Sequence, residues 1–114
     1  MYKSISTYLI PKNVDPQEFW EYHTGPHARD VVGGAGPELK RYVVNRVTDV
    51  IRGEMQFWGL IEKWWESKES RDEYLRRAKF IKGSTTGMSP PEEFRSRAYG
   101  GFGAWVEERE IPLL

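Results

Sequence analysis

The strict alternation of residues 2–10, followed by a change to helical spacing, limits the possible folds of this chain more than any other feature. Polar and apolar side chains alternate along this segment, which is rich in β-branched and aromatic residues and predicts a strand. Residues 39–47 and 55–65 predict two more strands, and the charged turn between them predicts a hairpin. Residues 104–110 predict the last strand. One helical segment precedes the hairpin and another follows it.

The first helical segment begins at a recognisable start signal. Asp15 is a favourable N-cap, and Glu18 stands three residues later, so the two predict a capping box. The tripeptide "TGP" at 24–26 breaks or kinks the helix, because proline lacks an N–H group. Residues 27–32 predict another turn or two. The glycines of 33–36 favour an ordinary helix stop, with a lid over a pocket as the functional alternative; no Lys-Ser/Thr follows them, which disfavours phosphate binding.

The second helical segment completes a β-α-β-β-α-β order. Ser67 or Ser70 caps it, Ser70 and Glu73 predict a second capping box, and Gly83 ends it. This order is that of the ferredoxin-like fold, an α+β architecture with a four-stranded antiparallel sheet and two helices on one face. Because 114 residues suffice for one core and not for two, we expect residues 1–114 to form a single domain.

Charge and cysteine content exclude several classes of function. The 17 basic and 17 acidic side chains cancel, so the chain lacks the net charge that binding to nucleic acid or to an anionic membrane surface requires. The absence of cysteine excludes disulfides, thiolate nucleophiles and cysteine zinc sites. No segment has the pattern of a signal peptide or of a membrane span. We therefore expect a cytoplasmic protein that binds neither nucleic acid nor membrane.

Both faces of the predicted sheet carry apolar side chains. On the first strand Tyr8 and Ile5 point to opposite sides, and on the third strand Leu60 and Trp64 point away from Ile61. Two helices cover only one face of such a sheet. A second copy of the chain is the simplest cover for the other face, which predicts a homodimer.

Both histidines of the chain lie close together, at positions 23 and 27. Four residues is the spacing of one helix face, although Pro26 falls inside the interval. Two histidines without a carboxylate at a matching interval make a poor metal site, so we expect no metal. His27 is a candidate general acid or base, because imidazole titrates near neutral pH, and a hydrogen-bonded histidine at a helix end is the structural alternative. Asp30 either orients His27 or faces solvent.

Two segments resemble the EthD-type family of the dimeric α+β barrel superfamily. They are "QEFWEYHTGPHARD", with Phe19, Tyr22 and His27, and "LKRYVVNRV", with Tyr42 and Asn45. The resemblance covers the first half of the chain well. The second half matches in element order and in the "FWGLIEKWWES" strand that runs into a helix.

The resemblance implies a homodimer whose sheets meet back to back, with a pocket between sheet and helices in each subunit. The histidine of the family corresponds to His27 and its tyrosine to Tyr42. The implied function is a cofactor-independent lyase, isomerase or cyclase that transfers a proton on an aromatic, polyketide-like or lactone/conjugated carbonyl substrate. The alternatives are a non-catalytic ligand-binding or stress-type barrel dimer and a cofactor-free monooxygenase. Arg29 stands where the family usually has proline, which affects the loop after His27 and the substrate class.

Tyr42 and Asn45 are three residues apart on a strand, so alternation sends them to opposite faces. Of the two we expect Tyr42 to line the pocket, where its hydroxyl could stabilise an enolate or phenolate oxygen. As a base, His27 must be neutral, so activity is expected to decline below about pH 6.5, the ordinary imidazole value. Five further residues are candidate substrate-binding walls of a small hydrophobic or aromatic compound: Tyr8, Trp20, His23, Trp58 and Trp64.

Overall fold

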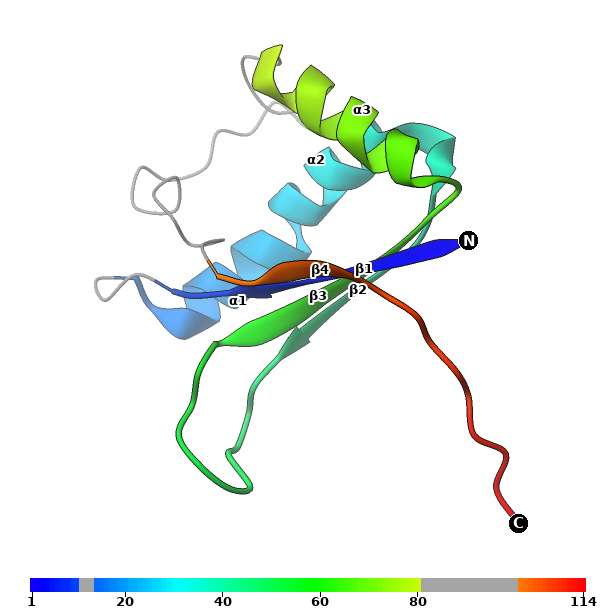
Figure 1. Ribbon diagram of the computed structural model, residues 1–114. Coiled ribbons are helices and arrows are strands. Elements are labelled where there is room, and N and C mark those ends of the chain that lie inside the picture. The colour runs from blue at the N-terminus through cyan, green and yellow to red at the C-terminus, as the bar shows by residue number, and fades with distance from the viewer. Residues whose placement is uncertain (11–13, 81–100) are drawn as a thin grey trace.

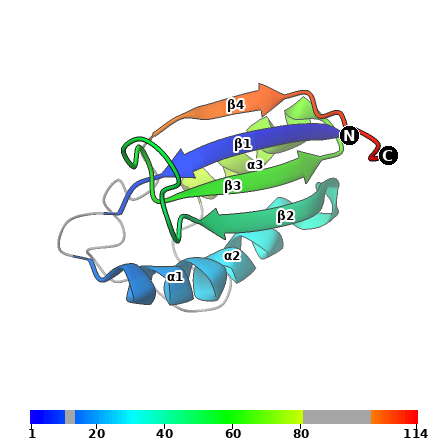
Figure 2. The same ribbon diagram turned by 90° about the horizontal axis from the view of Figure 1, so that it is seen from below.

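Four strands form one antiparallel sheet in the computed structural model, which describes residues 1–10, 14–80 and 101–114. They are β1 (Tyr2–Tyr8), β2 (Leu39–Arg46), β3 (Gly59–Trp65) and β4 (Gly103–Val106). Their order across the sheet is β2-β3-β1-β4, and each neighbouring pair is antiparallel (Figure 2). The predicted ferredoxin-like arrangement is therefore confirmed. Strand β3 begins later than the predicted residue 55, and β4 ends before the predicted residue 110.

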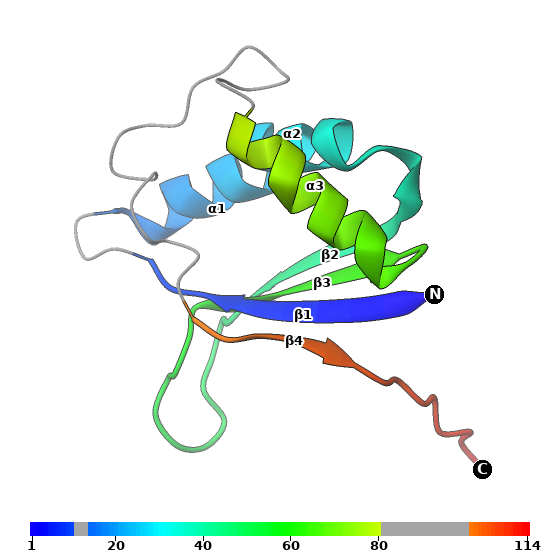
Figure 3. The same cartoon turned by 45° about the horizontal axis from the view of Figure 1, so that its top comes forward.

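The helices of the described residues all lie on one face of this sheet (Figures 1 and 3). They are α1 (Pro16–Thr24), α2 (Pro26–Ala35), the short 3-10 helix η1 (Gly36–Glu38) and α3 (Lys68–Phe80). The predicted break separates α1 from α2 at Gly25, where a Cβ would come within 2.8 Å of the Glu21 carbonyl oxygen. Pro26 then begins α2, because its missing N–H is harmless in a first turn.

Helix α2 is longer than predicted, because the glycine-rich segment mostly continues it. Residues 33–35 are helical, and Gly36, with a φ of 73°, ends the helix. The Arg77 guanidinium of α3 donates to the Gly34 carbonyl oxygen at 3.1 Å, which joins the end of α2 to α3. This segment is thus a helix end and not a lid. The predicted end of the second helical segment at Gly83 lies outside the described residues.

Side-chain caps fix the beginnings of α1 and α3. Asp15 Oδ1 accepts the backbone N–H groups of Gln17 and Glu18, both at 2.9 Å, so the predicted N-cap is confirmed. At α3, Ser67 Oγ accepts the Ser70 N–H at 3.1 Å. Ser67 is therefore the cap, and Ser70 is buried in the first turn. The capping box predicted to begin at Ser70 was wrong, because the helix starts earlier.

The core between α1 and the sheet is built on Tyr8 of β1. Its ring is 1% exposed and lies 5.6 Å from the Phe19 ring centroid. Its hydroxyl donates to the Asn45 carbonyl oxygen of β2 at 3.2 Å, so the side chain crosses the intervening strand β3. The crossing point is Gly59, where a Cβ would overlap both the Tyr8 ring and the Asn45 carbonyl oxygen. Glycine is required there for the close approach.

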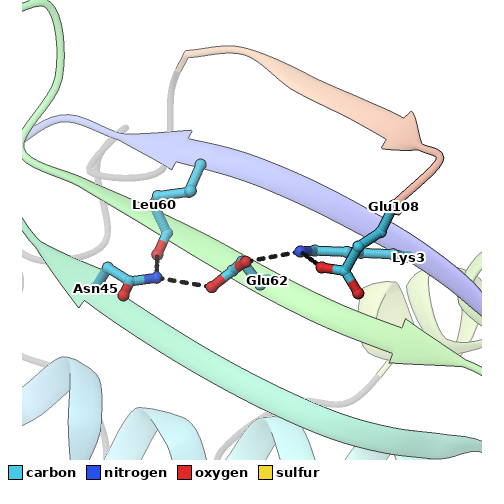
Figure 4. Close-up of polar contacts among 5 residues, drawn as sticks. All are labelled: Lys3, Asn45, Leu60, Glu62 and Glu108. Atoms are coloured by element: carbon cyan, nitrogen blue, oxygen red, sulfur yellow. Dashed lines mark hydrogen bonds and ion pairs between the residues drawn. The ribbon is translucent and has the colours of Figure 1, made fainter. Parts of the chain in front are cut away.

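The other face of the sheet carries no helix among the described residues (Figure 2). A row of paired polar groups crosses it (Figure 4). Lys3 Nζ lies 2.8 Å from the Glu62 carboxylate and 2.6 Å from that of Glu108. The Asn45 amide donates to Glu62 at 3.0 Å and to the Leu60 carbonyl oxygen at 3.1 Å. Hydrogen bonds to Glu108 and then Glu62 raise the pKa of Lys3. No helix of the described residues has the length and apolar character that crossing a membrane would need.

Replacing Gly59 with alanine should destabilise the fold, because the new methyl group overlaps backbone and ring atoms that cannot both withdraw. We expect a loss of about 1–3 kcal/mol in the free energy of unfolding, the usual cost of overpacking. Gly103→Ala is the matched control, since its Cβ would meet its neighbours at ordinary distances of 3.8 and 4.0 Å. Urea unfolding measures both variants. Equal stabilities for the two variants would contradict the assigned close approach.

Candidate functional site

The two histidines lie side by side although the helix is broken between them. His23, at the end of α1, is fully buried, and its ring stacks on the rings of Tyr8 at 4.9 Å and Phe19 at 5.3 Å. His27, in the first turn of α2, stacks on His23 at 5.1 Å. Its ring also lies 5.9 Å from that of Tyr22. The break at residue 25 therefore keeps both imidazoles on the sheet side of the helices.

Burial keeps both imidazoles neutral. It lowers the pKa of His23 to about 3, helped by the neighbouring His27 and by Lys63. It lowers the pKa of His27 to about 4, helped by Lys63 and opposed by Asp30. A base with a pKa of about 4 loses its function near pH 4 as the solution is acidified. The decline in activity that the sequence predicted below about pH 6.5 is therefore expected at lower pH. The reason is that the ordinary imidazole pKa does not hold in this environment.

Lys63 and Tyr42 bring charge and a hydroxyl group to the same region. They are paired residues of β3 and β2, and the Lys63 ammonium lies 5.3 Å from the Tyr42 ring centroid and 5.9 Å from that of Tyr74. Burial, and then the charge of Arg71, lowers the pKa of Lys63 to about 8. Among the described residues Lys63 has no carboxylate partner within ion-pair distance.

The Tyr42 hydroxyl is a buried donor without a hydrogen-bond partner among the residues that the structure describes. Its oxygen is inaccessible to solvent and makes no hydrogen bond within the described part of the chain. Burial, and then the neighbouring Tyr74, raises the pKa of this hydroxyl, so it stays protonated over the physiological range. An unsatisfied buried hydroxyl costs free energy, and such groups require an explanation. Neither of the two cavity walls described below includes Tyr42 or His27.

Sequence reasoning missed Lys63, although its strand contains a signal. On β3 the residues that face the helices are Gly59, Ile61, Lys63 and Trp65, since they alternate with the Leu60, Glu62 and Trp64 of the open face. A lysine between two large apolar residues on the core-facing side of a strand is unusual. The same alternation places Asn45 on the open face, bonded to Glu62, while Tyr42 faces the helices.

Two cavities lie on the helix side of the sheet. One, of about 160 Å³, lies between the sheet and α3, and Lys63, Trp65, Arg71 and Tyr74 line it. The other, of about 250 Å³, lies beside α1 at the turn end of the β2–β3 hairpin. Its wall includes three of the predicted substrate-binding residues and one arginine: Tyr8, Trp20, Trp58 and Arg46.

Two predicted wall residues lie elsewhere. Trp64 faces the open side of the sheet, where the Arg41 guanidinium and the Lys3 ammonium lie 4.5 and 4.6 Å from its ring centroid. It is separated from the histidines by the sheet, because it alternates with Lys63. His23 lines neither of the two cavities and is enclosed by the rings of the core. Across the described residues, no group of three or more possible metal ligands is present.

The buried imidazole of His23 should make stability depend on pH. Its folded pKa of about 3 lies below the ordinary 6.5, so between these values the unfolded chain binds the extra proton and stability falls as pH falls. Between pH 7 and pH 5 this group alone should remove about 2 kcal/mol. His23→Phe keeps an aromatic ring but removes the titrating group. Between pH 7 and pH 5, urea unfolding should show that the variant loses about 2 kcal/mol less of its free energy of unfolding than the wild-type protein. Parallel losses in both proteins would contradict the buried neutral imidazole.

The fold recurs in solved structures of low sequence identity. The crystal structure of At3g17210 from Arabidopsis thaliana aligns with a TM-score of 0.62 and 14% identity, covering 99% of this chain and 100% of that one. Its solution structure gives a TM-score of 0.62 and 16% identity over 98% and 91% of the two chains. An EthD-family protein of Bacillus halodurans aligns with a TM-score of 0.52 and 21% identity, over 97% of this chain and 100% of that one. No family model and no curated protein matches the sequence. The chain therefore shares the fold of an EthD-family protein.

Proposed function

We propose that this protein is a small cofactor-independent enzyme of the EthD type, a lyase, isomerase or cyclase, that transfers a proton on an aromatic or conjugated carbonyl compound. The observation that carries the proposal is the buried Tyr42 hydroxyl, which lacks a hydrogen-bond partner among the described residues and belongs to a ring whose centroid lies 5.3 Å from the Lys63 ammonium. A donor of this kind is suited to an oxygen that gains negative charge during a reaction. The fold shared with an EthD-family protein supports the EthD-type part of the proposal.

His27 would act as the base. Its neutral imidazole takes a proton from a carbon next to a carbonyl group, the C–H electron pair moves into the carbonyl system, and an enolate oxygen forms. Tyr42 donates its hydroxyl hydrogen bond to that oxygen, and the Lys63 charge favours the enolate. The imidazolium then returns the proton to a carbon or to a leaving group. Burial, and then the charge of Lys63, lowers the pKa of His27, which favours the neutral imidazole that a base requires.

Non-catalytic binding of an apolar ligand is the second candidate function. The cavity of about 250 Å³ supports it, because Tyr8, Trp20 and Trp58 provide an aromatic wall apart from His27 and Tyr42. The Arg46 guanidinium lies 4.7 Å from the Trp20 ring centroid and forms one polar edge. A binding protein would retain its ligand affinity when His27 and Tyr42 are replaced.

Proton exchange at carbon tests the catalytic proposal across a whole class of substrates. A panel of aromatic ketones, lactones and β-dicarbonyl compounds is incubated with the protein in D₂O, and loss of α-proton signals is followed by NMR. His27→Gln should slow the catalysed exchange by about 10² to 10⁴, and Tyr42→Phe by about 10 to 10³. Tyr2→Phe, at an exposed tyrosine of β1, is the matched control for hydroxyl removal. Full exchange activity in a folded His27→Gln protein would refute the proposal.

We also propose a homodimer in which the open face of the sheet is covered by a second copy. Val43, Leu60 and Val106 are only partly buried on this face. Lys3, Glu62 and Glu108 of the same face are already paired, so burying these three charges costs less than burying free charges. Exposed apolar side chains also occur in the β2–β3 turn and in the C-terminal segment, both of which extend away from the helices (Figure 1): Val50, Ile51, Met55, Ile111, Leu113 and Leu114.

Light scattering coupled to size exclusion tests this dimer. The mass should be about twice the 13.3 kDa of one chain. Val43→Asp places an unpaired charge in the middle of the open face and should give a monomer. Val32→Asp, at an exposed position of α2, is the matched control and should stay dimeric. A wild-type protein that remains monomeric at micromolar concentration excludes this assembly.

A further inference from the structure

The cavity of about 160 Å³ between the sheet and α3 has an unusual distribution of charge. Two cationic side chains contribute to its wall, Lys63 from β3 and Arg71 from α3, and no carboxylate of the described residues does. Among the described residues, the Arg71 guanidinium has one carboxylate within ion-pair distance, that of the exposed Asp72 at 3.9 Å. Two cations that share one small cavity repel each other, and an anion between them would remove that repulsion.

Neutral donors complete the wall. Ser4 and Ser6 of β1 line the cavity opposite α3, and Ser4 Oγ accepts the Trp65 indole N–H at 3.2 Å. Because that bond uses an acceptor site of the hydroxyl, the Ser4 O–H group remains a donor toward the cavity. Burial raises the pKa of Tyr74, which keeps its hydroxyl a donor as well. The polar groups of the wall are therefore largely donors, as an oxyanion requires.

The size and the apolar part of the wall indicate the rest of the ligand. About 160 Å³ is smaller than a pocket for a drug-sized molecule and suits a small organic acid. Trp65 and Trp105 supply flat aromatic surfaces, and the Arg71 guanidinium lies 5.9 Å from the Trp105 ring centroid. A planar group can lie against these rings while its carboxylate meets the two cations.

We infer that this cavity binds the carboxylate of an aromatic or similarly planar monocarboxylic acid between Lys63 and Arg71. The inference rests on the proposed function in one respect, namely that the bound acid is the compound on which His27 acts. Lys63 then has two contacts, the Tyr42 ring on one side and the ligand on the other. The substrate class of the proposed enzyme is thereby narrowed from carbonyl compounds in general to acids.

Isothermal titration with benzoate and with its neutral isostere benzamide tests the inference. Benzoate should bind at least about 10-fold more tightly than benzamide, because one charge-assisted hydrogen bond to a cation is worth that much. Lys63→Met and Arg71→Gln should each weaken benzoate binding by about 10-fold or more and leave benzamide nearly unaffected. Lys40→Met on β2 and Arg76→Gln on α3 are the matched controls, since both are exposed and lie outside the cavity wall.

Several outcomes would overturn the inference. They are equal affinities for benzoate and benzamide, equal losses in the control variants, and no benzoate binding up to about 10 mM. Circular dichroism checks that each variant is folded, and if Lys63→Met is not, the partly exposed Arg71→Gln decides the question. Titration measures binding without turnover. If the wild-type protein shows no preference for the carboxylate, this inference alone is refuted, whereas unchanged proton exchange in His27→Gln refutes only the proposed function.

Discussion

The contact between the Tyr8 ring and Gly59 is the constraint on which the rest of the site depends. Because position 59 has no side chain, Tyr8 reaches across β3 and donates to the Asn45 carbonyl oxygen of β2. The ring then forms the surface on which His23 stacks, and His23 in turn supports His27. Gly59 of β3 thus helps to set the position of the His27 imidazole on α2, through the rings of Tyr8 and His23. Close packing transmits such constraints because a core has few voids that could absorb a shift.

Much of this arrangement could be predicted from the sequence, because it follows from local rules. The N-cap at Asp15, the break before Pro26 and the division of Tyr42 and Asn45 between two faces all follow from short-range geometry. The start of α3 did not, since Ser67 and Ser70 are equally good caps and only packing decides that Ser70 is buried. Local rules give directions of side chains, and they do not give the neighbours of those side chains in space.

The electrostatics of the site could not be read from the sequence for the same reason. The pKa of His27 depends on the burial of its side chain and on Lys63, which is far away along the chain and on another element. An imidazole pKa near 6.5 describes a solvated side chain and does not apply to the buried His27. Lys63 itself was overlooked because a lysine in a strand is normally taken as exposed. Its position between Ile61 and Trp65 on the core-facing side of β3 was the available signal.

Two lysines of the same sheet show how the faces differ in chemistry. Lys3 on the open face has two carboxylate partners, and these raise its pKa. Lys63 on the helix face has no such partner among the described residues, and burial lowers its pKa to about 8. Paired charges satisfy each other and make a surface that a second copy can cover at modest cost. A charge that is enclosed but not neutralised retains its attraction for an anion, so the helix face, and not the open face, is where ligand chemistry is expected.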